Sequence, residues 1–488
     1  MRRFILLIPV VLLTFRVGAQ DVLNLEQCRK LALEHNQKMK MAAEQVHAAD
    51  DAMKAAFTQY LPGFSINGAY THMNRDLQLL KDDLFLPVVP YTAIDASTGQ
   101  LSSALYTNPA VAAATFVINP ATGSVVTDAA GNPVFQKYTY LPASATKFGI
   151  DNLYVANASL TQPVFTGGKI RELNRIARYT KEIAENNLTL TQNELIYSLE
   201  EAYWRVVSLK EKVKMAEEYH DMLVRLVSDL EAIQNEGIIT NNDLLKAKLK
   251  LSESELMMLK ARNGMELSKM ALCQMIGVPY TSTLQVSDTL NSFDPSLINY
   301  TVDQNAISGR PEVKILENNV AIAQSGVNVM ISRFLPDVAL NAGYTFTNPN
   351  PYNGLEKEFG GDWNVGVVAS VPLFHFGERL HTYAAARHEQ TAAEMKLEES
   401  RELMVLQLQQ AVYQYTESVK KTDYANMALD QAKKNLDFVN DNYNEGMKKI
   451  TDQLEAQVLW QKAYSDLIDA RTEQQMAVCN LKKVTGKN

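Results

Sequence analysis

Three segments of the chain occur twice, and this internal duplication limits the possible folds more than any other feature. The matching pairs are QYLPGFSINGAYTH (59–72) with RFLPDVALNAGYTF (333–346), LTQPVFTGGKIRELNRIARY (160–179) with ASVPLFHFGERLHTYAAARH (369–388), and NEGIITNNDLLKA (235–247) with NEGMKKITDQLEA (444–456). The second and third pairs share an offset of 209 residues. We therefore expect two repeats, 20–275 and 302–488, joined by a linker at 276–301.

The first repeat contains an insertion. Its first pair is offset by 274 residues rather than 209, and the surplus matches the segment 76–150. The second repeat has only a short stretch near 349–361 at this place. The segment 76–150 is rich in Pro, Gly, Ala, Ser and Thr, and several of these residues favour turns and irregular structure. Since it joins the strands at their end away from the helices, we expect one long extracellular loop there.

Each repeat also contains two segments in which apolar residues alternate with Ser, Asn, Thr or Gly. Alternation with a period of two places the two sets on opposite faces of a β-strand. The small polar face is typical of a water-filled lumen. From the strands alone, a half-buried sheet in a soluble domain is the more common structure. The expected strands are about 62–75, 152–165, 336–348 and 362–374.

Long segments without proline follow the second strand of each repeat. Apolar residues recur every seven positions from Leu188 to Leu230 within 168–236, and from Leu397 to Val439 within 376–445. Such series are typical of coiled coils. A helix of this length extends about 100 Å, and two helices of half that length would match it end to end. The expected shorter helices are 24–60, 242–275, 302–333 and 452–485.

Four strands are too few to close a membrane barrel, which needs about eight or more. An open sheet in lipid would leave the backbone of two edges unpaired, which is costly. If the strands cross a membrane, several chains must therefore share one barrel. The sequence thus predicts an α+β membrane protein with four transmembrane strands per chain and long antiparallel helices.

The N-terminus predicts export. Residues 1–19 combine Arg2 and Arg3 with an apolar run and a small-residue break, as a secretory signal peptide does. The formal net charge of −8 argues against nucleic acid as a partner. The chain has 3 cysteines, too few for a disulfide framework.

The duplicated strand pair, the LPG and LPD motifs, the QPVF and VPLF motifs and the NEG segments together resemble the TolC family of outer membrane factors. The resemblance covers essentially the whole chain after residue 19. It implies a homotrimer with a shared 12-stranded barrel in outer-membrane lipid and a periplasmic α-barrel tunnel. It also implies docking to a periplasmic adaptor protein and an inner-membrane transporter of the RND or ABC type.

The two helix-to-helix turns, 237–241 and 446–451, are expected at the periplasmic tips of the long helices. Gly237 and Gly446 supply the backbone freedom that a tight turn requires. Thr240 and Thr451 lie just before the next helix. By resemblance, these four residues belong to the surface that docks the adaptor.

The resemblance also assigns a gate to these tips. The family's acidic aperture falls on Asp452 and Glu455, which lie on one helix face and would form carboxylate rings in a trimer. The closed-state tether falls on Lys448 with Asp243, and the family's aromatic residue on Tyr443. Two differences are Glu at 455, where Asp is common, and Lys rather than Arg at 448.

No phosphate-binding glycine loop, HExxH or GxSxG motif occurs in the sequence. A metal site built from His375, His381 and His388 is a weak alternative to lumen or interface histidines. We expect no enzymatic activity, no cofactor and no metal. The leading prediction is a passive channel of a tripartite efflux or type I secretion system; a structural or adhesive coiled-coil protein without a pore is the alternative.

Overall fold

The computed structural model describes residues 22–74, 77–235, 240–290 and 305–486. The expected signal peptide, 1–19, lies outside these residues. The chain divides into two units. A helical unit comprises Met1–Thr58, Thr166–Leu335 and Pro372–Asn488, and a strand unit comprises Gln59–Phe165 and Pro336–Val371.

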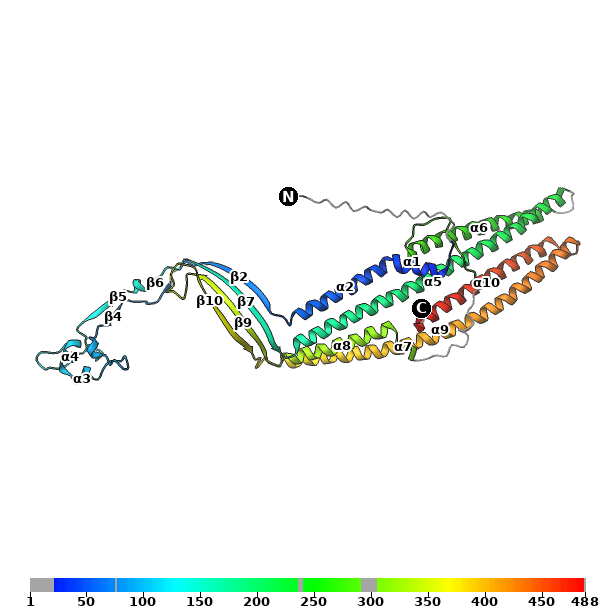
Figure 1. The fold of residues 1–488 in the computed structure, drawn as a ribbon. Coiled ribbons are helices and arrows are strands. Elements are labelled where there is room, and N and C mark those ends of the chain that lie inside the picture. Colours follow the sequence, from blue (N-terminus) through cyan, green and yellow to red (C-terminus); the bar gives the residue numbers. More distant parts are fainter. Residues whose placement is uncertain (1–21, 75–76, 236–239, 291–304, 487–488) are drawn as a thin grey trace, which may run out of the picture. The chain divides into compact units, whose positions relative to one another are not determined.

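Two helices of 67 residues each dominate the helical unit, α5 (Lys169–Asn235) and α9 (Glu378–Asn444). Each folds back on a helix of 36 residues, α6 (Asn241–Ile276) and α10 (Ile450–Thr485) respectively, as Figure 1 shows. The heptad pattern explains the packing of α9, because every buried residue of this helix is a heptad position. These residues are Met404, Leu408, Ala411, Tyr415, Ser418, Thr422, Leu436 and Val439.

Shorter helices precede the first strand of each repeat in the sequence. They are α1 (Leu25–His35), α2 (Gln37–Thr58), α7 (Asn305–Ser308) and α8 (Pro311–Ser332).

One helix was expected over 24–60, but the structure breaks it at Asn36, whose backbone is extended. The Asn36 side chain accepts a hydrogen bond from the backbone of Lys38 (2.8 Å) and donates one to the carbonyl of Met275 (3.0 Å). The bond to Met275 connects the break to α6, and both bonds stabilise it.

The linker after α6 is attached to the helical core. A two-residue parallel pair joins β1 (Val22–Leu23) to β8 (Gln285–Val286). The fully buried Tyr203 of α5 donates a hydrogen bond to Asp288 (2.6 Å), and Lys210 donates one to the carbonyl of Val286 (3.0 Å). Among the described residues, no helix has the length and apolar character needed to cross a membrane.

The strand unit contains a four-stranded sheet with the order β10-β9-β7-β2. Its strands are β2 (Gly63–His72), β7 (Asn152–Thr166), β9 (Asp337–Asn348) and β10 (Gly360–Ser370). The pairs β2–β7 and β9–β10 are antiparallel. Strands β2 and β10 are the two edges of this sheet.

The segment 76–150, expected to be an extracellular loop, has more internal structure than the turns that its composition predicts. Its described part contains short ordered elements around a small core of its own, formed by Ala93, Leu105 and Phe116. The elements are β3 (Leu77–Gln78), β4 (Leu84–Pro87), η1 (Tyr91–Ala93), α3 (Ala104–Thr107), α4 (Pro109–Thr115), β5 (Tyr138–Leu141), η2 (Ala143–Thr146) and β6 (Lys147–Phe148). The sequence carries no periodicity that would reveal this core, because its members are scattered along the segment.

Candidate functional site

The strand register places like residues opposite each other. Ile66 pairs with Ala158, and Val367 pairs with Leu340, so the apolar sets share one face. On the other face Ser65 pairs with Ser159, and their hydroxyl groups lie 2.9 Å apart. One face of the sheet is therefore apolar and the other small and polar.

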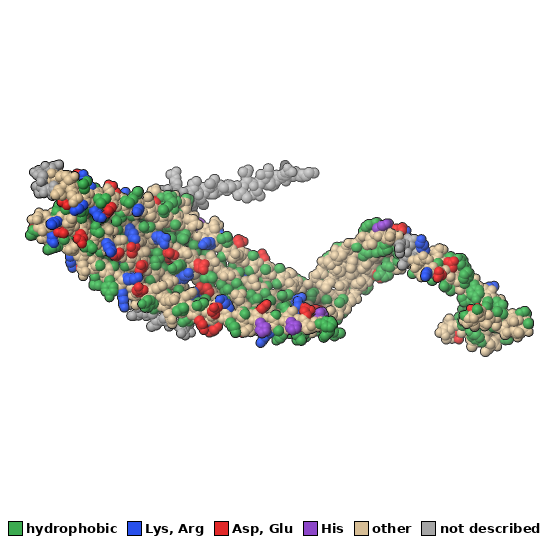
Figure 2. Space-filling view, turned by 180° about the vertical axis from the view of Figure 1, so that it is seen from behind, with side chains coloured by type: hydrophobic (Ala, Val, Ile, Leu, Met, Phe, Trp, Pro, Cys, Tyr) green, Lys and Arg blue, Asp and Glu red, His purple; other side chains and the backbone are tan. Residues whose placement is uncertain are grey.

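The apolar face is exposed in the single chain. Ile66, Val365 and Trp363 are 69%, 67% and 71% exposed respectively. Bulky apolar side chains at alternate positions of a sheet need either a protein core or lipid to cover them. On the face visible in Figure 2, the strands carry mainly hydrophobic and uncharged side chains, whereas Lys, Arg, Asp and Glu gather over the helices.

On the polar face, asparagines form a row across the sheet. Asn67 pairs with Asn157, and Asn364 pairs with Gly343. A Cβ atom added at Gly343 would lie 3.1 Å from Oδ1 of Asn364 and 3.7 Å from Oδ1 of Asn157. Glycine therefore leaves room for the two flanking amides, so this row gives the polar face a lining of hydrogen-bonding groups.

Aromatic rings gather at the end of the sheet where β2 ends and β7 begins. The rings of Tyr70 and Tyr154 lie 5.0 Å apart, those of Tyr154 and Phe359 5.9 Å, and those of Phe346 and Phe359 5.3 Å. Aromatic residues at the ends of strands are typical of the girdles that mark the membrane–water interfaces of barrels.

At the first helix tip, Gly237 lies outside the described residues. Thr240 precedes α6 in an extended conformation, and its hydroxyl group donates a hydrogen bond to the Asp243 carboxylate (2.8 Å). The ammonium group of Lys246 lies 3.8 Å from the same carboxylate. An acid in the first turn of a helix interacts favourably with the helix dipole. These contacts hold the Asp243 side chain in place at the tip.

At the second tip, Gly446 adopts the left-handed conformation with a φ of +77°. Its N–H donates to the carbonyl of Tyr443 (2.9 Å), and the N–H of Met447 donates to the carbonyl of Asn442 (2.9 Å). These bonds end α9 by the usual glycine mechanism. Lys448 is exposed on the turn that leads into α10, and Thr451 is exposed in the first turn of that helix.

The acidic pair lies on the first turns of α10. A carboxylate oxygen of Asp452 accepts a hydrogen bond from the backbone N–H of Lys449 (3.2 Å), and Glu455 is exposed. Ile450 and Leu454, on the other side of the helix, are buried against α5 and α6. Because apolar contacts fix that side, both carboxylates remain near the surface of the tip.

The two tips meet through Tyr443. Its side chain packs against the apolar cluster that contains Leu230 of α5 and Leu244 of α6. Burial raises the pKa of the Tyr443 phenol, and the nearby carboxylates of Asp229 and Asp243 raise it further. In the described part of the chain, no ion pair joins Lys448 to Asp243, whereas the charge of Asp243 acts on the Tyr443 phenol of the other tip.

The family model for outer membrane efflux proteins matches residues 100–278 and 302–487. The chain belongs to the outer membrane efflux protein family. It is 23% identical to the alkaline protease secretion protein AprF of Pseudomonas aeruginosa over 348 residues, which cover 68% of this chain and 69% of that protein. It is 24% identical to TolC of Vibrio cholerae over 324 residues, covering 62% and 70% of the two chains.

The fold is also similar to that of the CmeC outer membrane channel of Campylobacter jejuni. The TM-score is 0.70 at 16% sequence identity, and the match covers 95% of this chain and 85% of CmeC. As a member of this family, the protein is an outer-membrane channel of efflux or secretion systems. It lies in the outer membrane with its helical part in the periplasm.

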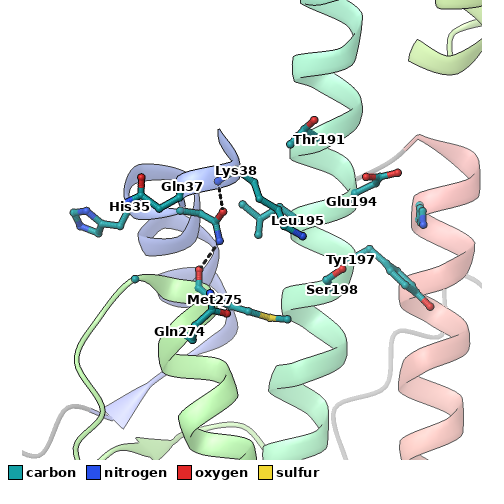
Figure 3. A pocket seen from close by; sticks show the side chains of 13 residues that line it. His35, Gln37, Lys38, Thr191, Glu194, Leu195, Tyr197, Ser198, Gln274 and Met275 are labelled. Atoms are coloured by element: carbon teal, nitrogen blue, oxygen red, sulfur yellow. Dashed lines mark hydrogen bonds between the residues drawn. The ribbon is translucent and has the colours of Figure 1, made fainter. Parts of the chain in front are cut away.

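The outer membrane efflux protein contains a further cavity that the sequence did not indicate. It has a volume of about 470 Å³ and lies at the break between α1 and α2, beside α5, α6 and α10 (Figure 3). The ammonium group of Lys483 lies 4.5 Å from the centre of the Tyr197 ring at this cavity. The only local signal for the cavity is Asn36, a helix-capping residue within a segment that otherwise reads as one helix.

The three histidines considered as metal ligands do not converge. A guanidinium nitrogen of Arg379 lies 2.6 Å from Nδ1 of His375 and donates a hydrogen bond to it. The described residues include no group of three or more His, Cys, Asp or Glu side chains placed to hold a metal ion.

Proposed function

We propose that three copies of the chain form one channel, with a shared 12-stranded barrel above a tunnel of helices. The observation that carries this proposal is the four-stranded sheet with an exposed apolar face and two open edges. Such a sheet has no stable place in lipid, because each edge exposes unpaired N–H and C=O groups. Pairing β2 of one copy with β10 of the next removes both edges.

In this assembly the apolar face contacts lipid and the polar face lines the lumen. The row that includes Asn67, Asn157 and Asn364 would then repeat around the barrel. We propose that the two sequence repeats, 20–275 and 302–488, contribute equivalent halves of each subunit, and that the chain conducts its cargo passively without catalysis of its own.

We propose that the tips dock to a periplasmic adaptor protein and, through it, to an inner-membrane transporter of the RND or ABC type. Thr240 at the first tip and Gly446 and Thr451 at the second are exposed, which supports this role. By sequence, Gly237 belongs to the first tip with Thr240. Because the sequence has no ATP-binding motif, the energy must come from the transporter. The similarity to a protease secretion protein makes a polypeptide one candidate cargo.

The gate is proposed at the same tips. Asp452 and Glu455 of three copies would form rings of carboxylates that favour cations at the aperture. Lys448 is exposed and has no ionic partner among the described residues of its own chain. We propose that it pairs with Asp243 of the neighbouring copy, beside Tyr443, and so holds the aperture closed.

Replacing Lys448 by Ala tests this tether. The Lys448→Ala channel should conduct more in a planar bilayer and admit more of a large antibiotic into cells. Lys433→Ala, a change at another exposed lysine of α9, is the matched control. The proposed tether is wrong if both variants behave like the unmodified protein.

A structural or adhesive role without a pore is the second candidate function. The ordered module within 76–150, with its own core, favours it, because a folded extension beyond the barrel could bind another surface. Conductance distinguishes the two roles: well-folded trimers that conduct no current, even after the gate residues are changed, would favour the scaffold.

A further inference from the structure

We propose that the β4–β5 ribbons of three copies pack against one another and form an apolar constriction at the outer opening of the channel. This inference rests on the proposed trimer. It concerns a surface that belongs to the insertion 76–150 rather than to the strands or helices of the channel itself.

The ribbon is a short antiparallel pair. Leu84 pairs with Leu141, Phe85 with Tyr140, and Pro87 with Tyr138. The segments 84–88 and 138–141 read LFLPV and YTYL, with no charged residue. The rings of Phe85 and Tyr140 lie 5.2 Å apart on one face.

Both faces of this ribbon are exposed in the single chain. Phe85 and Tyr140 on one face are 64% and 53% exposed, and Leu84 and Leu86 on the other are 39% and 42% exposed. An isolated two-stranded ribbon is marginal in water, and one with apolar side chains on both faces needs a cover. The ribbon therefore has the composition of an interface rather than of a free loop.

The ribbon is nevertheless held in a defined structure at both ends. At its base, the carboxylate of Asp83 accepts hydrogen bonds from the hydroxyl group of Tyr140 (2.7 Å) and the backbone N–H of Ala143 (2.8 Å). At its other end the chain continues into the module packed around Phe116, whose ring lies 5.0 Å from that of Phe135. A surface fixed in this way can dock without first paying a large ordering entropy.

Copies of the same chain are the cover that the connectivity favours. The ribbon lies between β2 and β7 in the sequence. Strand β2 ends at His72 and β7 begins at Asn152, and these two residues are paired. Strand β2 is an open edge of the sheet, where the neighbouring copy would pair. Three ribbons would thus arise from one rim, each beside a subunit interface, and their uncharged apolar surfaces would be complementary to one another.

Cysteine cross-linking in the full-length protein tests the inference. The three native cysteines, Cys28, Cys273 and Cys479, are buried, so the unmodified protein should give no cross-linked product. Phe85→Cys should give covalent dimers and trimers with a short bis-maleimide. Ala121→Cys, an exposed position of the module outside the ribbon, is the matched control and should give markedly less product.

A second variant tests whether the trimer forms, independently of the ribbon contact. Asn67→Cys with Asn364→Cys places thiols on the two edge strands, on the polar face. If this pair cross-links between copies and Phe85→Cys does not, the trimer stands and the ribbon contact is wrong. If neither cross-links in well-folded protein, both proposals fail.

Channel current gives an independent readout. With Asp452→Asn and Glu455→Gln present to relieve the inner gate, Phe85→Ser with Leu86→Ser should raise the conductance about twofold or more, because an apolar constriction hinders hydrated ions. An unchanged conductance in trimers that still assemble would overturn the constriction.

Discussion

Gly277 ends α6 in the left-handed conformation, with a φ of +74°, and it lies against α1. A Cβ atom added at this position would lie 2.7 Å from Cβ of His35. Only glycine combines this backbone conformation with so close an approach. Gly264, in the interior of the same helix, has an ordinary helical backbone and 3.5 Å to its nearest neighbour, Cδ2 of Leu209.

Alanine at these two positions should therefore have opposite effects. Gly277→Ala should lower the stability by about 1–3 kcal/mol, because it adds left-handed strain and a clash. Gly264→Ala should raise it by up to about 1 kcal/mol, because alanine is the better helix former. Thermal unfolding followed by circular dichroism in detergent measures both. Shifts of equal sign would contradict the account of the α1–α6 contact.

The buried Glu172, in the first turn of α5, gives a pH-dependent contribution. Burial raises the pKa of its carboxyl group, but hydrogen bonds from Asn328 and Arg171 and the charges of Arg175 and Arg171 outweigh this and leave the pKa below its usual value. A depressed folded-state pKa stabilises the protein above the unfolded-state value. That stabilisation is lost as the pH falls through the folded-state pKa.

Glu172→Gln should therefore destabilise the protein by about 1–3 kcal/mol at neutral pH, since it removes a charge-assisted hydrogen-bond acceptor. The difference from the unmodified protein should shrink once the pH falls below about 4. Unfolding midpoints at neutral and acidic pH test this. A difference that is constant with pH would mean that packing, rather than ionisation, causes the loss.

At the scale of elements, sequence periodicity carries most of the information about the long helices and the strands. The expected bounds 168–236 compare with Lys169–Asn235, and 376–445 with Glu378–Asn444. Heptads favour a helix over their whole length, and glycine marks both ends. Two other features of the fold depend on contacts between residues far apart in the sequence. The break at Asn36 depends on Met275 of another helix, and the core around Phe116 joins residues with no shared period.

Part of the candidate site could be predicted from the sequence, and part depends on contacts that the sequence does not reveal. The tip residues follow from the turn motifs and the family resemblance, and the structure adds that Tyr443 packs against the apolar cluster of the first tip. The proposed partner of Lys448 belongs to another copy of the chain, so neither one sequence nor one chain can display that contact. The cavity at Asn36 forms between five helices, α1, α2, α5, α6 and α10, and has no sequence motif.

Adjacent residues of β10 test which face of the sheet meets lipid. Val365→Lys places a charge on the apolar face and should cost about 2–4 kcal/mol near the middle of the membrane. Asn364→Lys places the same charge on the polar face, where water is available, and should be tolerated. The yield of folded trimers in outer-membrane fractions measures both. If Asn364→Lys is the more damaging change, the assignment of the two faces is reversed.

At the scale of the whole molecule, one chain cannot complete its own structure. The sheet has two open edges and an exposed apolar face, Lys448 has no ionic partner among the described residues of its own chain, and the β4–β5 ribbon exposes apolar residues on both faces. The proposed closed trimer would account for all of these features, because each incomplete surface would then face lipid, water or a copy of the chain. In the proposed trimer, the carboxylates of Asp452 and Glu455 would lie in rings around one aperture.

Single-channel current through the purified protein in a planar bilayer tests this account most directly. The unmodified channel should show a small, cation-selective conductance. Asp452→Asn with Glu455→Gln removes the charges but keeps a side chain that can accept the helix-capping bond at 452. It should conduct more and lose cation selectivity, whereas Asp466→Asn, an exposed acid farther along α10, should leave both unchanged. Trimers whose selectivity is the same in all three proteins would contradict the acidic aperture, and trimers that never conduct would contradict the channel.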